Sequence, residues 1–242
     1  MPGEVILVGG GPGDPGLLTL AGMDALTSAD VIVYDRLAPL SLLDGCTGEK
    51  IPVGKIPRGP FTPQEAINEL LVTHARAGKK VVRFKGGDSF VFGRGGEEWD
   101  YCTAHGVKIT TIPGVTSAVA VPELAGIPVT HRSLTQGFVT VSGHVGPGHP
   151  ESTVNWAALA QANLTIVILM GVQALPEITA ELVASGLDAD TPAAVIADGG
   201  LPSQRVVRAR LADIAAAARE ADIHPPAITV IGDVTTALKE FS

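Results

Sequence analysis

The first 36 residues alternate apolar runs with a glycine-rich loop, and this order most constrains the fold. Residues 5–8 form a continuous apolar run, as expected of a strand that is buried on both faces. A loop rich in glycine and proline follows at residues 9–16, then an apolar-faced helix that ends near Ser28, then a second apolar run at residues 31–34. Strand, glycine loop, helix and strand in this order predict an α/β domain with a parallel sheet.

The same alternation continues to the end of the chain. Further strands are expected at residues 50–53, 81–84, 107–112, 138–142, 164–170, 193–197, 205–208 and 227–231, and further helices at residues 39–43, 97–105, 156–161, 175–185, 211–220 and 234–239. A capping box at Thr62, with proline at the first helical position, predicts one more helix through Ala75. We therefore predict an α/β protein of two α/β domains, residues 1–113 and 114–242.

A second glycine-rich stretch follows the expected strand at residues 81–84. Gly86 and Gly87 come directly after the strand, Asp88 follows them, and three more glycines lie at positions 93, 95 and 96. Strand and helix interiors do not need so many glycines, because each glycine costs backbone entropy and fills no space. Paired glycines let a ligand lie directly against the backbone, with a carboxylate beside it. An ordinary glycine-rich turn is the alternative.

The first glycine loop also satisfies a dinucleotide-binding pattern. Gly11, Gly13 and Gly16 match G-x-G-x-x-G, and Asp35 stands about 20 residues further on, where a ribose-binding acid is expected. The two prolines inside the loop fit this pattern poorly, because a phosphate cradle donates backbone N–H groups and proline has none. A nucleotide-dependent oxidoreductase therefore remains an alternative.

Charge and composition narrow the class of ligand. The net charge of −8 and the aromatic content of 4% argue against nucleic-acid and membrane-surface binding. Nine of the 17 basic residues nevertheless lie between Lys50 and Arg94, which favours an anionic small molecule there. Cys46 and Cys102 are too few for a disulfide framework, and neither an export signal nor a membrane-length apolar run is visible, so a cytoplasmic setting is expected.

Four stretches carry a family resemblance: residues 8–15, 33–37, 83–98 and 113–118. In this order they resemble the tetrapyrrole methylases, and within them the group that uses S-adenosylmethionine to methylate carbon atoms of uroporphyrinogen III. Residues 126–132, 169–171 and 204–207 extend the resemblance over essentially the whole chain.

The resemblance implies two α/β domains with a cleft between them, a homodimer, and two successive methyl transfers to C2 and C7 of uroporphyrinogen III. The products would be precorrin-2, on the route to sirohaem and cobalamins, and S-adenosylhomocysteine. It assigns Asp35 as proton acceptor and Lys55 as proton donor. It also implies a set of cofactor-binding positions, namely Pro12, Gly86, Gly87, Asp88, Val91, Thr116, Ser117, Met170, Gly199 and Ala227.

The substrate of this family carries eight carboxylates, and arginine suits bidentate contacts to them. Arg58, Arg94 and Arg132 are the candidates, together with Lys55, although an internal salt bridge is an equal alternative for each. His144 and His149 flank glycine and proline without a further ligand at metal spacing, so no metal site is expected.

Two other functions remain open. A sister methylase acting on a later precorrin, on diphthamide or on ribosomal RNA would use the same cofactor. A non-catalytic binding protein would have to retain both glycine-rich half-sites by chance.

Overall fold

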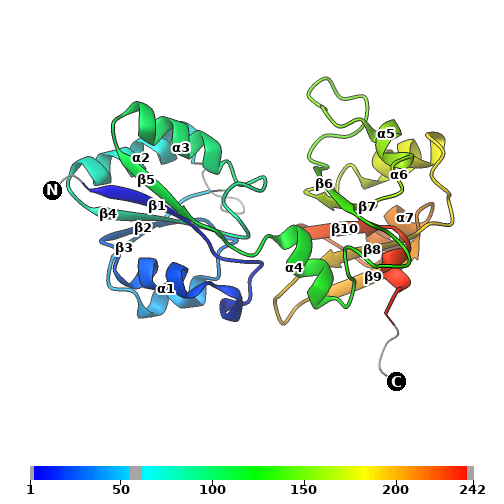
Figure 1. Cartoon of the computed structure of the whole chain (residues 1–242), viewed down its shortest axis with the longest axis horizontal. Coiled ribbons are helices and arrows are strands. Elements are labelled where there is room, and N and C mark those ends of the chain that lie inside the picture. The colour runs from blue at the N-terminus through cyan, green and yellow to red at the C-terminus, as the bar shows by residue number, and fades with distance from the viewer. Residues whose placement is uncertain (1–2, 55–61, 239–242) are drawn as a thin grey trace. The chain divides into compact units, whose positions relative to one another are not determined.

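The structure is a computed structural model that describes residues 3–54 and 62–238. The chain divides into two compact units, Met1–Thr116 and Ser117–Ser242, each built around its own five-stranded sheet (Figure 1). No helix in the described part of the chain is long and apolar enough to cross a membrane.

The N-terminal unit is a parallel α/β sandwich. Its elements are β1 Glu4–Gly9, α1 Leu20–Thr27, β2 Val31–Tyr34, β3 Glu49–Pro52, α2 Gln64–Arg76, β4 Lys80–Lys85, α3 Gly95–Ala104 and β5 Lys108–Ile112. The strand order is β3-β2-β4-β1-β5 and every pairing is parallel, which confirms the predicted sheet. In Figure 1, α1 covers one face of this sheet, and α2 and α3 cover the other.

Two apolar cores result from this layering. Leu26 of α1 packs with Ile32 and Phe84 on one face, while Leu71 of α2 and Cys102 of α3 pack with the apolar side chains of the other. The chain crosses from β1 to β2 in one direction and from β4 to β5 in the opposite one, so right-handed crossovers place their helices on opposite faces. The neighbouring carboxyl ends of β1 and β4 are therefore the expected ligand crevice of this sheet.

The C-terminal unit has a mixed sheet. Its elements are α4 Ser117–Leu124, β6 Phe138–Ser142, α5 Trp156–Ala160, β7 Thr165–Leu169, α6 Leu175–Ala184, β8 Pro192–Ala197, β9 Arg205–Arg210, α7 Ile214–Glu220 and β10 Ala227–Ile231. The order is β6-β7-β10-β8-β9, in which only the β6–β7 pairing is parallel. One core joins α5, α6 and α7 to the sheet, and a second joins α4 to the opposite face.

The start of α2 differs from the prediction. The helix begins at Gln64, with Pro63 as its N-cap and no side-chain capping bond, so the predicted capping box at Thr62 is wrong. In the first turn of this helix the Gln64 amide donates to Asn68 Oδ1 at 2.9 Å and to Glu98 Oε1 at 3.3 Å.

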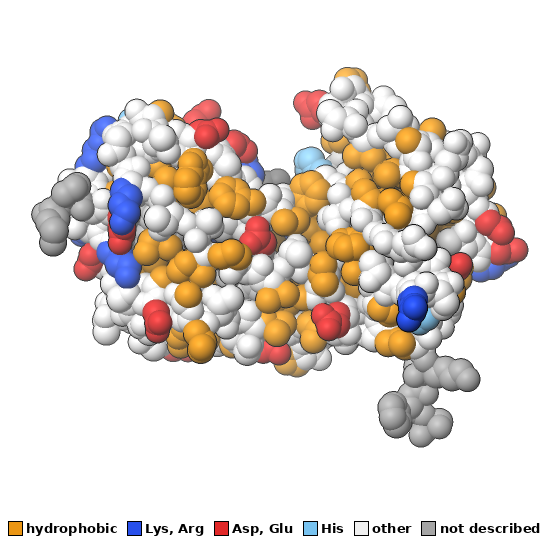
Figure 2. Space-filling model, in the orientation of Figure 1, with side chains coloured by type: hydrophobic (Ala, Val, Ile, Leu, Met, Phe, Trp, Pro, Cys, Tyr) orange, Lys and Arg blue, Asp and Glu red, His pale blue; other side chains and the backbone are white. Residues whose placement is uncertain are grey.

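The structure shows how the surface charges are distributed and where the two cysteines lie. On the face drawn in Figure 2, acidic and basic side chains are dispersed and form no continuous basic patch. Cys46 and Cys102 are buried and free, and burial raises the pKa of the Cys102 thiol to about 11. Both thiols therefore belong to the cores of the N-terminal unit.

Candidate functional site

Glycine loops converge where the strands of the N-terminal sheet end. The loop after β1 and the loop after β4 exchange two backbone hydrogen bonds: Gly11 N–H donates to Gly87 O at 3.1 Å, and Gly87 N–H donates to Gly11 O at 2.6 Å. Gly10 N–H adds a third bond, to Lys85 O, at 2.7 Å. These two loops are thus joined at the crevice that the sheet topology predicts.

The loop after β5 packs against the same place. A Cβ atom added to Gly114 would lie 2.2 Å from the Gly87 carbonyl oxygen and 2.6 Å from Gly9 Cα. A Cβ atom on Gly86 would lie 2.6 Å from Leu37 O, in the loop after β2. Glycine is therefore required at Gly86 and Gly114 by the packing of the loops on one another, before any ligand binds.

Asp88 ties two of these loops together. Its Oδ1 accepts from Phe90 N–H at 2.9 Å, and its Oδ2 accepts from Gly114 N–H at 3.1 Å. Both oxygens thus accept backbone bonds within the protein, and the position of this carboxylate beside a ligand stays a prediction. What these loops offer a ligand is mainly backbone and the exposed apolar side chains that follow the strand ends, namely Leu37, Phe90, Phe92 and Val115.

The first glycine loop is poor in free N–H donors. Gly10, Gly11 and Gly16 all donate within the protein, Gly16 to Asp14 Oδ1 at 2.8 Å, and Pro12 and Pro15 have no N–H to give. A pyrophosphate cradle works by donating several N–H groups to the ligand. The loop geometry therefore argues against the dinucleotide alternative.

Asp35 lies at the carboxyl end of β2, near these loops. Its Oδ1 accepts from Leu37 N–H at 3.1 Å, and its Oδ2 lies 3.5 Å from an Nη atom of Arg83. The side chain is 24% exposed, so the carboxylate remains accessible to a small molecule. Lys55, its predicted partner in proton transfer, lies outside the described residues, as does Arg58.

Beneath Asp35 lies a buried ion cluster that the sequence reasoning missed. Arg83 and Lys85 are two residues apart on β4, so their side chains project from the same face of the sheet, toward α3. Arg83 Nε donates to Glu98 Oε1 at 2.9 Å, and Lys85 Nζ lies 2.9 Å from each Glu98 oxygen. Burial lowers the pKa of Lys85, the positive charge of Arg83 lowers it further, and Glu98 opposes both effects. The available signal was Arg83 and Lys85 at alternating positions around Phe84, next to the apolar residues Val81 and Val82.

The remaining predicted cations are exposed. Arg94, which has a left-handed backbone with φ 58°, pairs with Glu97 through bonds of 2.8 and 2.7 Å. Arg132 lies exposed in a turn of the C-terminal unit. The structure thus shows the internal salt bridge that the sequence left as an alternative for Arg94, and this ion pair is exposed to solvent.

Three of the cofactor positions predicted in the C-terminal unit gather at one edge of its sheet. Met170 directly follows β7 with a left-handed backbone, φ 59°, and Gly199 follows β8. Ala227 begins the antiparallel strand β10, where it pairs with Ala197. Gly199 is tightly packed, because an added Cβ atom would lie 2.3 Å from Val121. Residues far apart in the sequence are therefore neighbours at this edge.

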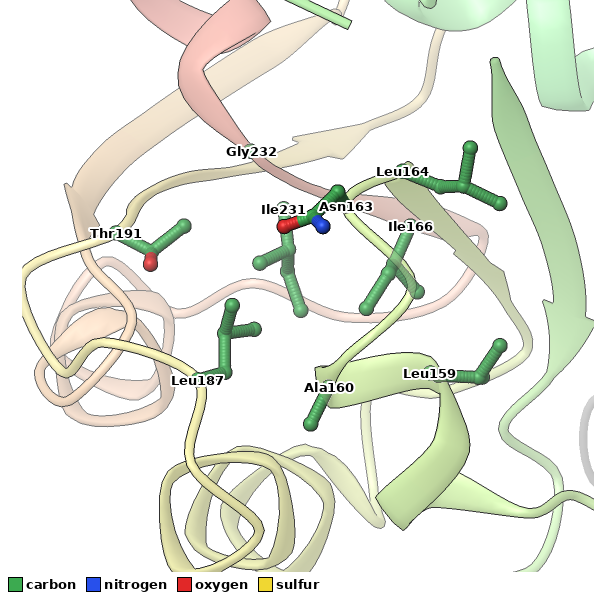
Figure 3. Close-up of a pocket in the computed structure, with 9 residues that line it drawn as sticks. All are labelled: Leu159, Ala160, Asn163, Leu164, Ile166, Leu187, Thr191, Ile231 and Gly232. Carbon is green, nitrogen blue, oxygen red and sulfur yellow. The ribbon is translucent and has the colours of Figure 1, made fainter. Parts of the chain in front are cut away.

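The cavity in Figure 3 lies at the other edge of the C-terminal sheet. Its lining includes Leu164, which precedes β7, Thr191, which precedes β8, and Gly232, which follows β10. The volume open to water is about 40 Å³, far below the roughly 300–1,000 Å³ of typical ligand sites. Within residues 3–54 and 62–238, no group of three His, Cys, Asp or Glu side chains is arranged to hold a metal.

Known proteins share the sequence and the fold of this chain. The sequence pattern of the Tetrapyrrole (Corrin/Porphyrin) Methylases matches residues 4–215. The chain is 50% identical to a protein of Methanosarcina barkeri named S-adenosyl-L-methionine-dependent uroporphyrinogen III methyltransferase, over 96% of this chain and 92% of that one. It is 45% identical to a siroheme synthase of Thiobacillus denitrificans, of which it spans about half, 48%.

Solved structures agree with the sequence comparisons. The uroporphyrin-III C-methyltransferase of Thermus thermophilus, complexed with S-adenosylhomocysteine, superposes with a TM-score of 0.83 at 40% identity, covering 98% of this chain and 96% of that one. A cobalt precorrin-4 methyltransferase superposes with a TM-score of 0.85 at 27% identity, over 96% and 95% of the two chains. The resemblance drawn from the four motifs is confirmed. The chain belongs to the tetrapyrrole methylase family.

Proposed function

We propose that this chain transfers two methyl groups, one after the other, from S-adenosylmethionine to C2 and C7 of uroporphyrinogen III. The products are precorrin-2, which leads to sirohaem and cobalamins, and S-adenosylhomocysteine. The observation that carries the proposal is the 50% identity to an enzyme named for this substrate, over 92% of that enzyme's length.

The crevice at the end of β1 and β4 fits the proposed cofactor. Its loops have few free N–H groups that could bind a pyrophosphate. They offer a ligand closely packed backbone and exposed apolar side chains, which suits an adenosyl group carrying a sulfonium. The sulfonium supplies a methyl group that is already activated. In the N-terminal unit the proposed contacts are Pro12, Gly86, Gly87, Asp88, Val91 and Thr116. In the C-terminal unit they are Ser117, Met170, Gly199 and Ala227.

The chain's own contribution is mainly alignment and proton removal. An electron-rich pyrrole carbon reacts with an activated methyl group once both are held near attack distance, so positioning supplies most of the rate. Asp35 is the proposed proton acceptor, since its carboxylate is accessible and is anchored through Leu37 N–H and Arg83. Lys55 is the proposed proton donor.

We assign the substrate carboxylates to exposed cations. Arg94 and Arg132 are both solvent-accessible, and Arg58 and Lys55 complete the proposed set. Arg94 already holds the planar, two-bond geometry toward Glu97 that a propionate or acetate side chain of the substrate would use.

The proposed assembly is a cytoplasmic homodimer, as the resemblance implies. Analytical ultracentrifugation of the purified protein tests the dimer: a sedimenting species of twice the 24.8 kDa chain mass supports it, and a 24.8 kDa species contradicts it.

The reaction is tested by incubating the protein with methyl-labelled S-adenosylmethionine and anaerobically prepared uroporphyrinogen III, then counting methyl groups in the extracted tetrapyrrole. Two methyl groups per macrocycle are expected. Cofactor binding without transfer would move the substrate to a sister class, and NAD(P) binding in place of S-adenosylhomocysteine would restore the oxidoreductase alternative.

The role of Asp35 is tested in the same assay. Asp35→Asn is expected to slow methyl transfer by about 100-fold or more, the lower range for loss of a general base, while S-adenosylhomocysteine affinity, measured by calorimetry, stays within about twofold. Transfer at the wild-type rate would exclude Asp35 as the proton acceptor.

A further inference from the structure

Arg83 and Lys85 of β4 and Glu98 of α3 form a buried ion cluster in the N-terminal unit. Glu98 is fully buried, at 0% exposure, and the two cations are 4% and 3% exposed. Removing a charge from water is costly, and a buried ion pair recovers this cost only when its hydrogen bonds are nearly complete. Here Glu98 accepts from Arg83, from Lys85 and, at 3.3 Å, from Gln64.

The charges balance only if Asp35 is included. Two cations face the single buried carboxylate of Glu98, and Asp35, 3.5 Å from Arg83, is the second anion in the described structure that an ion pair joins to them. Arg83 therefore links a carboxylate that is sealed from solvent to one that is open to it.

The orientation of Arg83 is set from the Glu98 side. Its Nε donates to Glu98 Oε1 at 2.9 Å, and one Nη donates to Val33 O at 3.4 Å and Phe84 O at 3.3 Å. The guanidinium is a rigid planar fork, so bonds on one side fix the direction of the remaining nitrogen. That nitrogen is the one that faces Asp35.

We propose that Glu98 is a positioning residue for methyl transfer, which acts through Arg83 to hold the Asp35 carboxylate in place and to set the positive charge it experiences. Lys85 completes the arrangement by donating to both Glu98 oxygens. Glu98 itself does not contact solvent and therefore does not act on the substrate directly. This inference rests on the proposed role of Asp35.

The test is Glu98→Gln, which keeps the side-chain volume and removes the charge. We expect kcat to fall by about 10- to 100-fold, the cost of small misplacements at a reacting centre, with KM for S-adenosylmethionine within about twofold of wild type. The acidic limb of the kcat–pH profile is expected to move to lower pH. The reason is that Arg83, freed of one counter-charge, favours the ionised carboxylate more strongly. A merely structural role for Glu98 would not move this limb.

Control variants separate the outcomes. Glu69→Gln removes an exposed carboxylate from α2, and both kcat and the pH profile are expected to stay unchanged. If Glu98→Gln does not fold, as judged by circular dichroism, Glu98→Asp keeps the charge but shortens the reach to Arg83, and a reduced kcat with an altered profile is expected.

A folded Glu98→Gln variant with wild-type kcat and pH profile would overturn the positioning role while leaving the proposed reaction intact. If Glu98→Gln does not fold, a Glu98→Asp variant with wild-type kcat and pH profile would overturn it in the same way. Wild-type protein that transfers no methyl group would overturn the proposed reaction itself, and the positioning role with it.

Discussion

Strands β4 and β10 occupy inner positions of their sheets and are almost equally buried, yet they differ in chemistry. The inner strand of the C-terminal unit, β10, is buried throughout, and its one polar residue is Thr229. In the N-terminal unit, β4 buries Arg83 and Lys85 alongside its apolar residues. The inner strand β10 is thus buried without charge, whereas the buried charges of β4 lie beside the proposed proton acceptor Asp35.

The two sheets also differ in the groups that lie at the ends of their strands. In the parallel N-terminal sheet all carboxyl ends lie at one edge, so three glycine loops and Asp35 gather there. In the mixed C-terminal sheet, an edge combines the ends of β7 and β8 with the beginning of β10. We propose that the strand ends of the N-terminal sheet supply both the acid–base chemistry and most of the cofactor contacts, and that the C-terminal sheet adds further cofactor contacts.

The largest effect on stability is expected at Ile231, at the opposite end of β10 from the proposed cofactor position Ala227. Ile231→Ala removes a side chain that is 1% exposed in the C-terminal core, and such truncations cost about 2–5 kcal/mol. Urea denaturation measures this loss. The rate of methyl transfer per folded molecule is expected to remain at the wild-type level. A clear loss of methyl transfer in fully folded Ile231→Ala protein would contradict the view that this part of β10 contributes only to stability.

Gly114→Ala is expected to reduce stability less than Ile231→Ala does, and to reduce cofactor binding more. The new Cβ atom would meet the Gly87 carbonyl at 2.2 Å, and backbone on both sides leaves it little room to move. Overpacking of this kind costs about 1–3 kcal/mol, and displacement of the joined loops is expected to abolish S-adenosylhomocysteine binding in calorimetry.

Gly96→Ala is the matched control for this substitution. Gly96 lies in α3 with open space where its Cβ would be, so alanine is expected to be neutral or to stabilise by about 0.5–1 kcal/mol. Equal cofactor affinity in the two alanine variants would show that loop packing does not shape the site.

The smallest effect on stability is expected at Arg94. Its ion pair with Glu97 is about half exposed, and such pairs contribute less than about 1 kcal/mol. Arg94→Ala is therefore expected to fold normally. Loss of one charge-assisted contact to a substrate carboxylate, about 1.5–3 kcal/mol, is expected to raise KM for the tetrapyrrole by roughly tenfold or more.

Arg210→Ala in the C-terminal unit removes an exposed pair of the same i,i+3 spacing, with Asp213, and is the control for Arg94→Ala. Its KM for the tetrapyrrole is expected to match wild type. An Arg94→Ala variant with unchanged KM would remove Arg94 from the substrate contacts.

Much of the fold could be predicted because buried strands leave a local signature. The apolar runs at residues 5–8 and 31–34 lie within observed strands, and the glycine loops lie at the expected strand ends. The capping box failed because the helix begins at Gln64 with Pro63 as its N-cap, and proline has no side-chain group that could make the capping bond. The local pattern did not report this shift of the helix start.

The ion cluster could not be predicted in the same way. Glu98 lies 13 residues from Lys85 and on a different element, and only the packing of α3 on the sheet brings them together. Asp88 is predicted to lie beside a ligand, and the structure adds that its oxygens accept bonds from Phe90 and Gly114. The identity of such a carboxylate can be read from the sequence, whereas its partners depend on tertiary contacts.

The central claim, that the loops at the carboxyl edge of the N-terminal sheet form the cofactor site, is tested most directly by hydrogen–deuterium exchange with and without S-adenosylhomocysteine. We predict that the ligand slows exchange at residues 9–14, 86–92 and 113–116 and leaves residues 205–210 and 214–220 unchanged. Unchanged exchange in all three loops, under conditions where calorimetry shows that the ligand is bound, would contradict the claim.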